Sequence, residues 1–446
     1  MDAHHHSSTE PTLAVVLSGA VARGAFQAGA LGQALTSIKA ELGLEPSIIL
    51  GTSAGAINAA LWAKAAAESG PDAAPRAVAE AVRDVWVQMS NDDVYADLVS
   101  WRPWVTWQTV RRVGLPGIRG FLVGGTGIDS LLDTTPLHEA ACRLLPDPLV
   151  LSGALRTVGV VATWVPPAGT PGSAAGRSVL FLQERTPSGW DGDEDRALDV
   201  ERCPIVPAHV LASSAVPAVF PAEAVPGGRS GWYVDGGVRL NTPLLPAIEL
   251  GATHILLVSA SSLRYPTYVP PGASPTAVDA ASQVMHAVVA DRAVEDLMAV
   301  ERTNDLLAQV KAAGAGLVRR GRQDRRRSER DYRTVEVMAV APPPGQLRDE
   351  VDRVWQSRYG SWWELLRLED NAVIGRALRA LGDGPGRSEL LSYVLFDEEY
   401  FAASYDRGVE AASRSMADLP SGVGGRWTWR TRPVTDRVPT PAGAAR

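Results

Sequence analysis

The chain has 446 residues, with 43 Lys and Arg against 50 Asp and Glu, so its formal net charge is −7. This acidic balance excludes a protein that coats nucleic acid, because binding to phosphate backbones needs a surplus of clustered basic residues. Hydrophobic residues make up 46% of the chain, enough to bury a sizeable core, so disorder throughout is excluded as well.

The two cysteines, Cys142 and Cys203, lie far apart and outside any Cys/His spacing that is typical of zinc or redox sites. We expect neither a metal nor an organic cofactor. The amino terminus has no basic segment followed by an apolar run, and four prolines interrupt the charge-free stretch at 203–222. We therefore expect no secretory signal and no membrane-spanning helix, a cytoplasmic location, and at most peripheral contact with membranes.

In chain order, the first predicted unit is a strand at 13–17, followed by a turn and a helix at 25–35. The second unit repeats this pattern, with a strand at 47–50, a tight turn and a helix at 56–67. Two adjacent units of this kind predict a parallel sheet that is covered by helices.

The strand–helix alternation continues to about residue 262. Further strands are predicted at 157–163, 178–182 and 254–259, the last after a helix at 244–250. Beyond it, the composition predicts a long helix at 277–312, a strand at 334–340, and helices at 362–367 and 372–381.

The predicted fold class is α/β, with three α/β/α layers around a mostly parallel central sheet and a helical carboxyl-terminal region. We expect four parts: a disordered amino terminus at 1–10, an α/β catalytic core at 11–262, a helical region with one added strand at 263–418, and a flexible tail at 419–446.

The sharpest motif is the GxSxG sequence from Gly51 to Gly55, placed between a predicted strand and a predicted helix. A serine at such an elbow is held in a strained turn, and the small flanking residues Gly51 and Gly55 keep strand and helix from colliding with it. The amino terminus of the following helix favours a developing oxyanion. This context points to Ser53 as a nucleophile.

A serine hydroxyl needs a positioned base. Asp235 follows an apolar run and opens the double-glycine turn of Gly236 and Gly237, which lets the backbone approach another loop closely. His254 would complete a Ser-Asp-His order, but it opens a predicted strand directly after a helix and so falls at the opposite end of the sheet. We interpret His254 as structural. No other histidine stands out, which favours a Ser/Asp dyad and leaves a Ser-Asp-His α/β-hydrolase as an alternative.

Four blocks in this order resemble those of the patatin-like phospholipases: 17–24, 51–55, 212–221, and 235–237 with 241–243. Shorter segments at 129–137, 296–307 and 392–396 are similar to those of bacterial members, so the resemblance spans residues 13–415. It implies a phospholipase A or esterase type of lipid acyl hydrolase, with Ser53 as nucleophile of an acyl-enzyme and Asp235 as its base.

One block departs from the family pattern. Members usually carry three consecutive glycines before the Arg-Gly or Lys-Gly of the oxyanion loop, and here the first of them, Gly19, is followed by Ala20 and Val21, with Arg23 and Gly24 retained. We expect the oxyanion donors to be the amides of Gly19, Ala20, Val21 and Ala54. Alanine and especially valine resist positive φ, so a catalytically weak or inactive lipid-binding scaffold is a further alternative.

The expected partner is a lipid or acyl-ester substrate, without nucleic acid, and the oligomeric state is left open. Arg23 is a possible phosphate contact or an anchor of its loop. The arginine-rich run at 319–333 is either a solvated loop or a contact with anionic headgroups. The tryptophans at 101, 104 and 107 are expected in a core.

Overall fold

The computed structural model describes residues 11–70, 73–89, 91–94, 134–167, 170, 176–217, 220–264, 276–286, 292–312, 333–359, 385–417, 419 and 427. Several sequence predictions lie outside these residues: the disordered amino terminus, the three clustered tryptophans, nearly all of the arginine-rich run, the helices at 362–367 and 372–381, and most of the tail.

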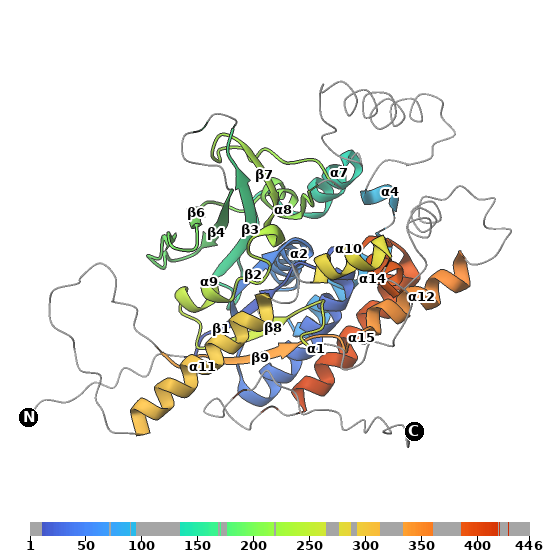
Figure 1. The fold of residues 1–446 in the computed structure, drawn as a ribbon. Coiled ribbons are helices and arrows are strands. Elements are labelled where there is room, and N and C mark those ends of the chain that lie inside the picture. Colours follow the sequence, from blue (N-terminus) through green and yellow to red (C-terminus); the bar gives the residue numbers. More distant parts are fainter. Residues whose placement is uncertain are drawn as a thin grey trace, which may run out of the picture.

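The described residues form a nine-stranded sheet with the order β5-β6-β4-β3-β2-β1-β8-β9, and β7 pairs separately with β3 (Figure 1). The strands are β1 (Leu13–Leu17), β2 (Pro46–Thr52), β3 (Thr157–Val165), β4 (Arg177–Glu184), β5 (Gly192–Asp193), β6 (Leu198–Arg202), β7 (Trp232–Asp235), β8 (His254–Val258) and β9 (Glu336–Val340).

The sheet is mixed and mostly parallel. Strands β3, β2, β1, β8 and β9 run parallel to one another, and β6 runs parallel to β4. Strand β3 is antiparallel to β4 and to β7, and β5 is antiparallel to β6. The predicted α/β class with a mostly parallel central sheet is confirmed.

Both faces of the sheet are buried. In β1, Leu13, Val15 and Leu17 belong to one hydrophobic cluster, while the alternate residues Ala14 and Val16 belong to another. Successive side chains of a strand point to opposite faces, so each cluster fills the space between the sheet and one helical layer. This two-sided burial explains why the strand is a continuous apolar run in the sequence.

Helices cover the two faces unequally. The helices that precede β7 in the chain are α1 (Gly24–Leu42), α2 (Ala54–Ser69), α3 (Pro75–Gln88), α4 (Asn91–Val94), α7 (Thr135–Leu144) and α8 (Pro207–Ser214). The helices that follow β7 are α9 (Leu244–Glu249), α10 (Ala277–His286), α11 (Arg292–Ala312), α12 (Gln346–Arg358), α14 (Pro385–Val394) and α15 (Glu398–Met416). Residues of α1, α2, α3, α12 and α15 share the first cluster, whereas α9 and α11 contribute to the second.

The carboxyl-terminal region packs directly on the amino-terminal part. Figure 1 shows α15, in red, beside α1, in blue, and β9 beside β8. The two helices meet closely at glycines: a Cβ on Gly29 would lie 2.1 Å from the Tyr405 carbonyl oxygen, and one on Gly408 would lie 2.1 Å from that of Phe26. The added strand therefore extends the same sheet, and α15 completes one of its layers.

The predicted helix at 277–312 corresponds to α10 and α11, between which residues 287–291 are not described. Within the described ranges, no helix is long and apolar enough to cross a bilayer.

Candidate active site

Ser53 occupies a sharp turn between β2 and α2. Its backbone takes φ 57° and ψ −128°, a strained conformation for a residue with a side chain, and the helix begins at the next residue. A Cβ on Gly51 would lie 2.2 Å from the Gly55 carbonyl oxygen, and one on Gly55 would lie 2.4 Å from that of Leu17. The turn closes only because both positions lack side chains, as the motif predicts.

The register of the sheet brings Asp235 to Ser53. Strand β3 pairs with β2 as far as Thr52, which lies opposite Val161, and it then pairs with β7, whose last residue Asp235 lies opposite Ala162. Strands β2 and β7 therefore lie along the same side of β3, and the end of β2 meets the end of β7. Residues 182 positions apart in the chain are thus placed at neighbouring positions of the sheet.

Asp235 is 5% exposed, and its carboxylate accepts a hydrogen bond from the Gly237 amide at 2.6 Å. Burial raises the pKa of Asp235 to about 6, although the neighbouring Ser53 hydroxyl and the Gly237 amide both favour the charged form. The carboxylate is therefore basic enough to take a proton and still ionised near neutral pH.

The loop after β1 lies against Ser53. A Cβ on Gly19 would be 3.3 Å from the Ser53 Cβ and 2.3 Å from Asn241 Oδ1, so this position needs glycine for space. Ala20 has an ordinary negative φ of −144°, whereas Val21 has φ 48°. The replacement at 21 thus carries backbone strain, and the replacement at 20 does not.

The amides of this loop have different partners. Gly19 N–H donates to Asn241 twice, to Oδ1 at 3.1 Å and to the carbonyl oxygen at 3.2 Å. Within the described part of the chain, the amides of Ala20 and Val21 donate to no protein acceptor. The Ala54 amide is in the first turn of α2, where helix geometry leaves N–H groups without intrahelical partners.

Arg23 is buried and bound within the protein. Its guanidinium donates to Glu389 at 2.6 Å, to Tyr393 at 2.9 Å and to the Ser392 hydroxyl at 3.0 Å, and it stacks on the Tyr393 ring at 3.8 Å. Burial is the largest single influence and disfavours the charged form of Glu389, but the charge and hydrogen bond of Arg23, together with other nearby basic groups, outweigh it and hold the pKa of Glu389 below its ordinary value. The geometry favours the anchoring interpretation of Arg23 over a phosphate contact.

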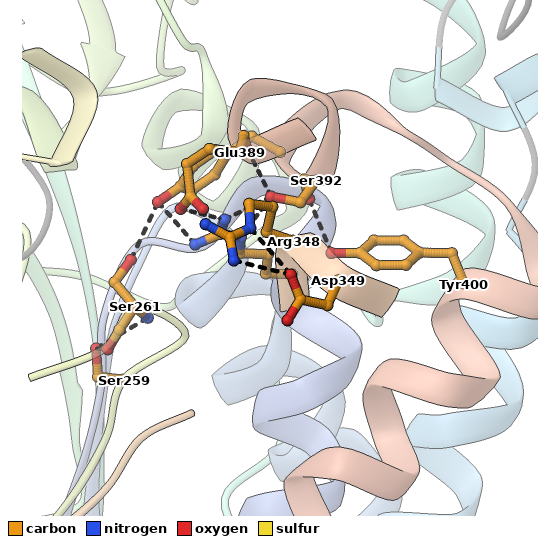
Figure 2. A network of polar contacts seen from close by, with 9 residues as sticks. Ser259, Ser261, Arg348, Asp349, Glu389, Ser392 and Tyr400 are labelled. Carbon is orange, nitrogen blue, oxygen red and sulfur yellow. Dashed lines mark hydrogen bonds and ion pairs between the residues drawn. The ribbon is translucent and has the colours of Figure 1, made fainter. Parts of the chain in front are cut away.

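This polar network reaches the sheet. Figure 2 shows Glu389 and Ser392 of α14 with Ser261 and Ser259, which follow β8. The Ser261 hydroxyl is 3.2 Å from that of Tyr393, and the Tyr400 hydroxyl of α15 donates to the Ser392 carbonyl at 3.0 Å. The loop beside Ser53 is therefore tied to helices more than 360 residues later in the chain. Nearby, a Cβ on Gly24 would lie 2.2 Å from the Trp86 ring, which fixes the start of α1.

His254 lies at the amino-terminal end of the parallel strands, whereas Ser53 lies at their carboxyl-terminal end. His254 opens β8 opposite Leu13, the first residue of β1, whereas the last residue Leu17 pairs with Gly51 beside the elbow. Its Nδ1 is 2.9 Å from the Thr253 hydroxyl, and its ring packs edge-on against Trp427. This placement separates His254 from Ser53 by the length of a strand.

The other histidines among the described residues have contacts of their own. His138 contacts Glu223 at 2.6 Å, and His286 ends α10. His209 lies 3.5 Å from the Cys203 sulfur; burial lowers the pKa of His209 to about 4 and raises that of the Cys203 thiol to about 11, so both are neutral.

Sequence reasoning missed three side chains that hold the dyad's surroundings. Ser213 Oγ accepts the Ser53 amide at 2.9 Å, Thr52 Oγ1 donates to the Leu240 carbonyl at 3.1 Å, and Thr163 Oγ1 donates to the Asp235 carbonyl at 3.1 Å. Thr52 and Ser213 fall inside blocks that carry the family resemblance, and this resemblance is the signal that could have drawn attention to them. Thr163 lies outside these blocks.

A family model described as patatin-like phospholipase matches residues 15–248, more than half of the chain. The chain therefore belongs to the patatin-like phospholipase family, which at family level comprises lipid acyl hydrolases.

Among solved structures, the chain is similar to VipD from Legionella pneumophila, with 14% identity and a TM-score of 0.26. The alignment covers 74% of this chain and 61% of that chain, so this chain spans less than two thirds of VipD. No curated protein matches.

Proposed function

We propose that the chain hydrolyses carboxylic esters of lipids through Ser53 and Asp235. The observation that carries this proposal is the placement of Ser53, at a strained elbow where β2 ends, next to the buried carboxylate of Asp235, which ends β7 on the same side of β3. Burial raises the pKa of this carboxylate to about 6. Family membership supports the lipid class of substrate.

The first half of the reaction acylates the enzyme. Asp235 takes the proton from Ser53 Oγ as that oxygen attacks the ester carbonyl carbon, and a tetrahedral oxyanion forms. When the intermediate collapses, the bond from carbon to the leaving oxygen breaks, and Asp235 returns the proton to the leaving alcohol. The acyl group is then esterified to Ser53.

The second half releases the fatty acid. Asp235 takes a proton from water, the resulting hydroxide attacks the acyl carbon, and the bond to Ser53 Oγ breaks. The proton held by Asp235 passes to Ser53, which restores the free enzyme.

Backbone amides stabilise the oxyanion in this proposal. The Gly19 amide is engaged by Asn241, so we assign the Ala20 and Val21 amides as the main donors, with the Ala54 amide at the helix terminus. Ala20 and Val21 keep their N–H groups, because replacing glycine at these positions changes only the side chains.

A non-catalytic lipid-binding scaffold is the second candidate. It is favoured by Val21, because a β-branched residue at φ 48° is strained and a loop under strain can place its amides away from the reacting carbonyl. A lipid substrate, no nucleic-acid partner, a cytoplasmic location and peripheral membrane contact stay expectations from the sequence.

Hydrolysis assays with two substitutions test the proposal. Ser53→Ala and Asp235→Asn should each abolish release of fatty acid from phosphatidylcholine vesicles and of p-nitrophenol from a p-nitrophenyl ester, while circular dichroism stays unchanged. Ser214→Ala serves as the control, since, within the described part of the chain, the Ser214 hydroxyl donates only to the Val210 carbonyl of its own helix. Turnover that survives either dyad substitution would overturn the assignment, and an inactive wild type would favour the scaffold.

A further inference from the structure

We infer that Ser213 is a positioning residue that holds the nucleophile's backbone in its strained conformation through one bridging hydroxyl. This inference rests on the proposed function, because it concerns the reactivity of Ser53.

The Ser213 hydroxyl makes two hydrogen bonds in a fully buried position. Its oxygen accepts the Ser53 amide at 2.9 Å, and its proton goes to the Val161 carbonyl of β3 at 2.5 Å. The residue has no exposed surface. One side chain from α8 thus links the elbow to the neighbouring strand.

The bridge stands where the regular ladder between β2 and β3 ends. The last paired residues are Thr52 and Val161. The next residue, Ser53, has positive φ, and its N–H donates to Ser213 and does not continue the hydrogen bonding between the strands. A buried N–H and a buried carbonyl without partners are both unfavourable. A hydroxyl resolves this because it can accept from one group and donate to the other at the same time.

The same segment also holds the base. The Asp235 amide donates to the Ala215 carbonyl at 2.8 Å, two residues after Ser213. The end of α8 therefore contacts the backbones of both dyad residues, and these contacts do not depend on the side chains of Ser53 and Asp235.

The neighbouring serine provides a matched control. Ser214 is also buried, but its hydroxyl donates to the Val210 carbonyl at 3.0 Å within α8 and does not contact the elbow. Loss of either hydroxyl removes a buried hydrogen bond, but only loss of the Ser213 hydroxyl frees the Ser53 backbone.

The experiment compares Ser213→Ala, Ser213→Cys and Ser214→Ala with the wild type in the full chain. Two quantities are measured well below each variant's melting temperature: the kinetics of p-nitrophenyl ester hydrolysis and the rate of Ser53 labelling by a fluorophosphonate, both per folded molecule. We expect Ser213→Ala to lower kcat and the labelling rate by about 10²-fold with KM nearly unchanged, because a displacement of about 1 Å can cost this much. Ser214→Ala should match the wild type.

Ser213→Cys keeps a donor and an acceptor on a slightly larger side chain but forms weaker hydrogen bonds, so it should label at a rate between those of wild type and Ser213→Ala. Equal labelling rates for Ser213→Ala and Ser214→Ala would overturn the inference while leaving the proposed function intact. If Ser213→Ala does not fold, wild-type reactivity in Ser213→Cys would overturn it instead. A wild type that never labels would overturn the proposed function and this inference with it.

Discussion

The elbow at 51–55 and the loop at 19–24 meet at Ser53, and their glycines leave room for different neighbouring atoms. The elbow at 51–55 keeps Gly51 and Gly55, whose missing Cβ atoms leave room for backbone carbonyls. The loop at 19–24 keeps Gly19 and Gly24, which leave room for the Asn241 side chain and the Trp86 ring, and has lost the glycines at 20 and 21.

In both loops, glycine is retained at the positions where a Cβ atom would clash with a neighbour. A positive φ alone does not require glycine at these loops. Ser53 and Val21 both have positive φ although neither is glycine. Strain of this kind persists where surrounding contacts over-determine the backbone. Ser213 holds the elbow, and Asn241 with the Arg23 network holds the other loop.

The largest effect is expected at the elbow. Gly55→Ala should lower the free energy of unfolding by more than about 3 kcal/mol, because its Cβ would collide with main-chain oxygens that cannot move aside cheaply. Gly43→Ala is the control, since Gly43 has φ 65° but open space around it and should lose only about 1 kcal/mol. Urea denaturation measures both, and equal losses would show that space is not what the elbow needs.

Asp235→Asn should stabilise the protein at alkaline pH while abolishing activity. The pKa of Asp235 is about 6 in the folded state against 3.8 as its ordinary value, so the folded state binds the proton more tightly. This group's contribution to stability is therefore greatest at low pH and falls as pH rises from about 4 to 6.

The asparagine keeps an oxygen for the Gly237 amide and cannot ionise. Its gain over wild type, at most about 3 kcal/mol, should appear above pH 6 and vanish below pH 4. Melting temperatures across this range measure it, and a gain that is independent of pH would contradict the raised pKa.

Arg23→Ala should cost about 2 kcal/mol, since it leaves the Glu389 charge without its partner while 21% of that side chain still reaches water. Adding Glu389→Ala should recover part of the loss, because the unpaired carboxylate is then gone. Additive losses in this double-mutant cycle would mean that the two charges are not coupled in solution.

The smallest effect is expected at Val21. Val21→Gly relieves positive-φ strain but loses packing and adds freedom to the unfolded chain, so stability should change by less than about 1 kcal/mol. If Asn241 and Arg23 already fix the loop, kcat should change by less than about threefold. An increase of about 10² would instead show that Val21 displaces an oxyanion donor.

The sequence predicts the core strands well because each is buried on both faces and forms a local apolar run, as in β1, β2, β3 and β8. It does not predict that β4 and β7 are antiparallel to β3, because their pairing depends on contacts far along the chain.

At the site, Ser53 follows from a local motif and Asp235 from a turn and a family resemblance. The anchoring of Arg23 could not be predicted, because its partners lie 366 to 370 residues away. Ser213 carries no spacing rule that distinguishes it from Ser214, and only the end of α8 in three dimensions separates their roles.

Labelling with a fluorophosphonate, followed by intact-mass measurement and peptide mapping, tests the central claim most directly. The account predicts a single adduct on Ser53, formed at a rate that rises up to about pH 6 and then levels as Asp235 ionises. An unlabelled wild type, or an adduct that persists in Ser53→Ala, would contradict it.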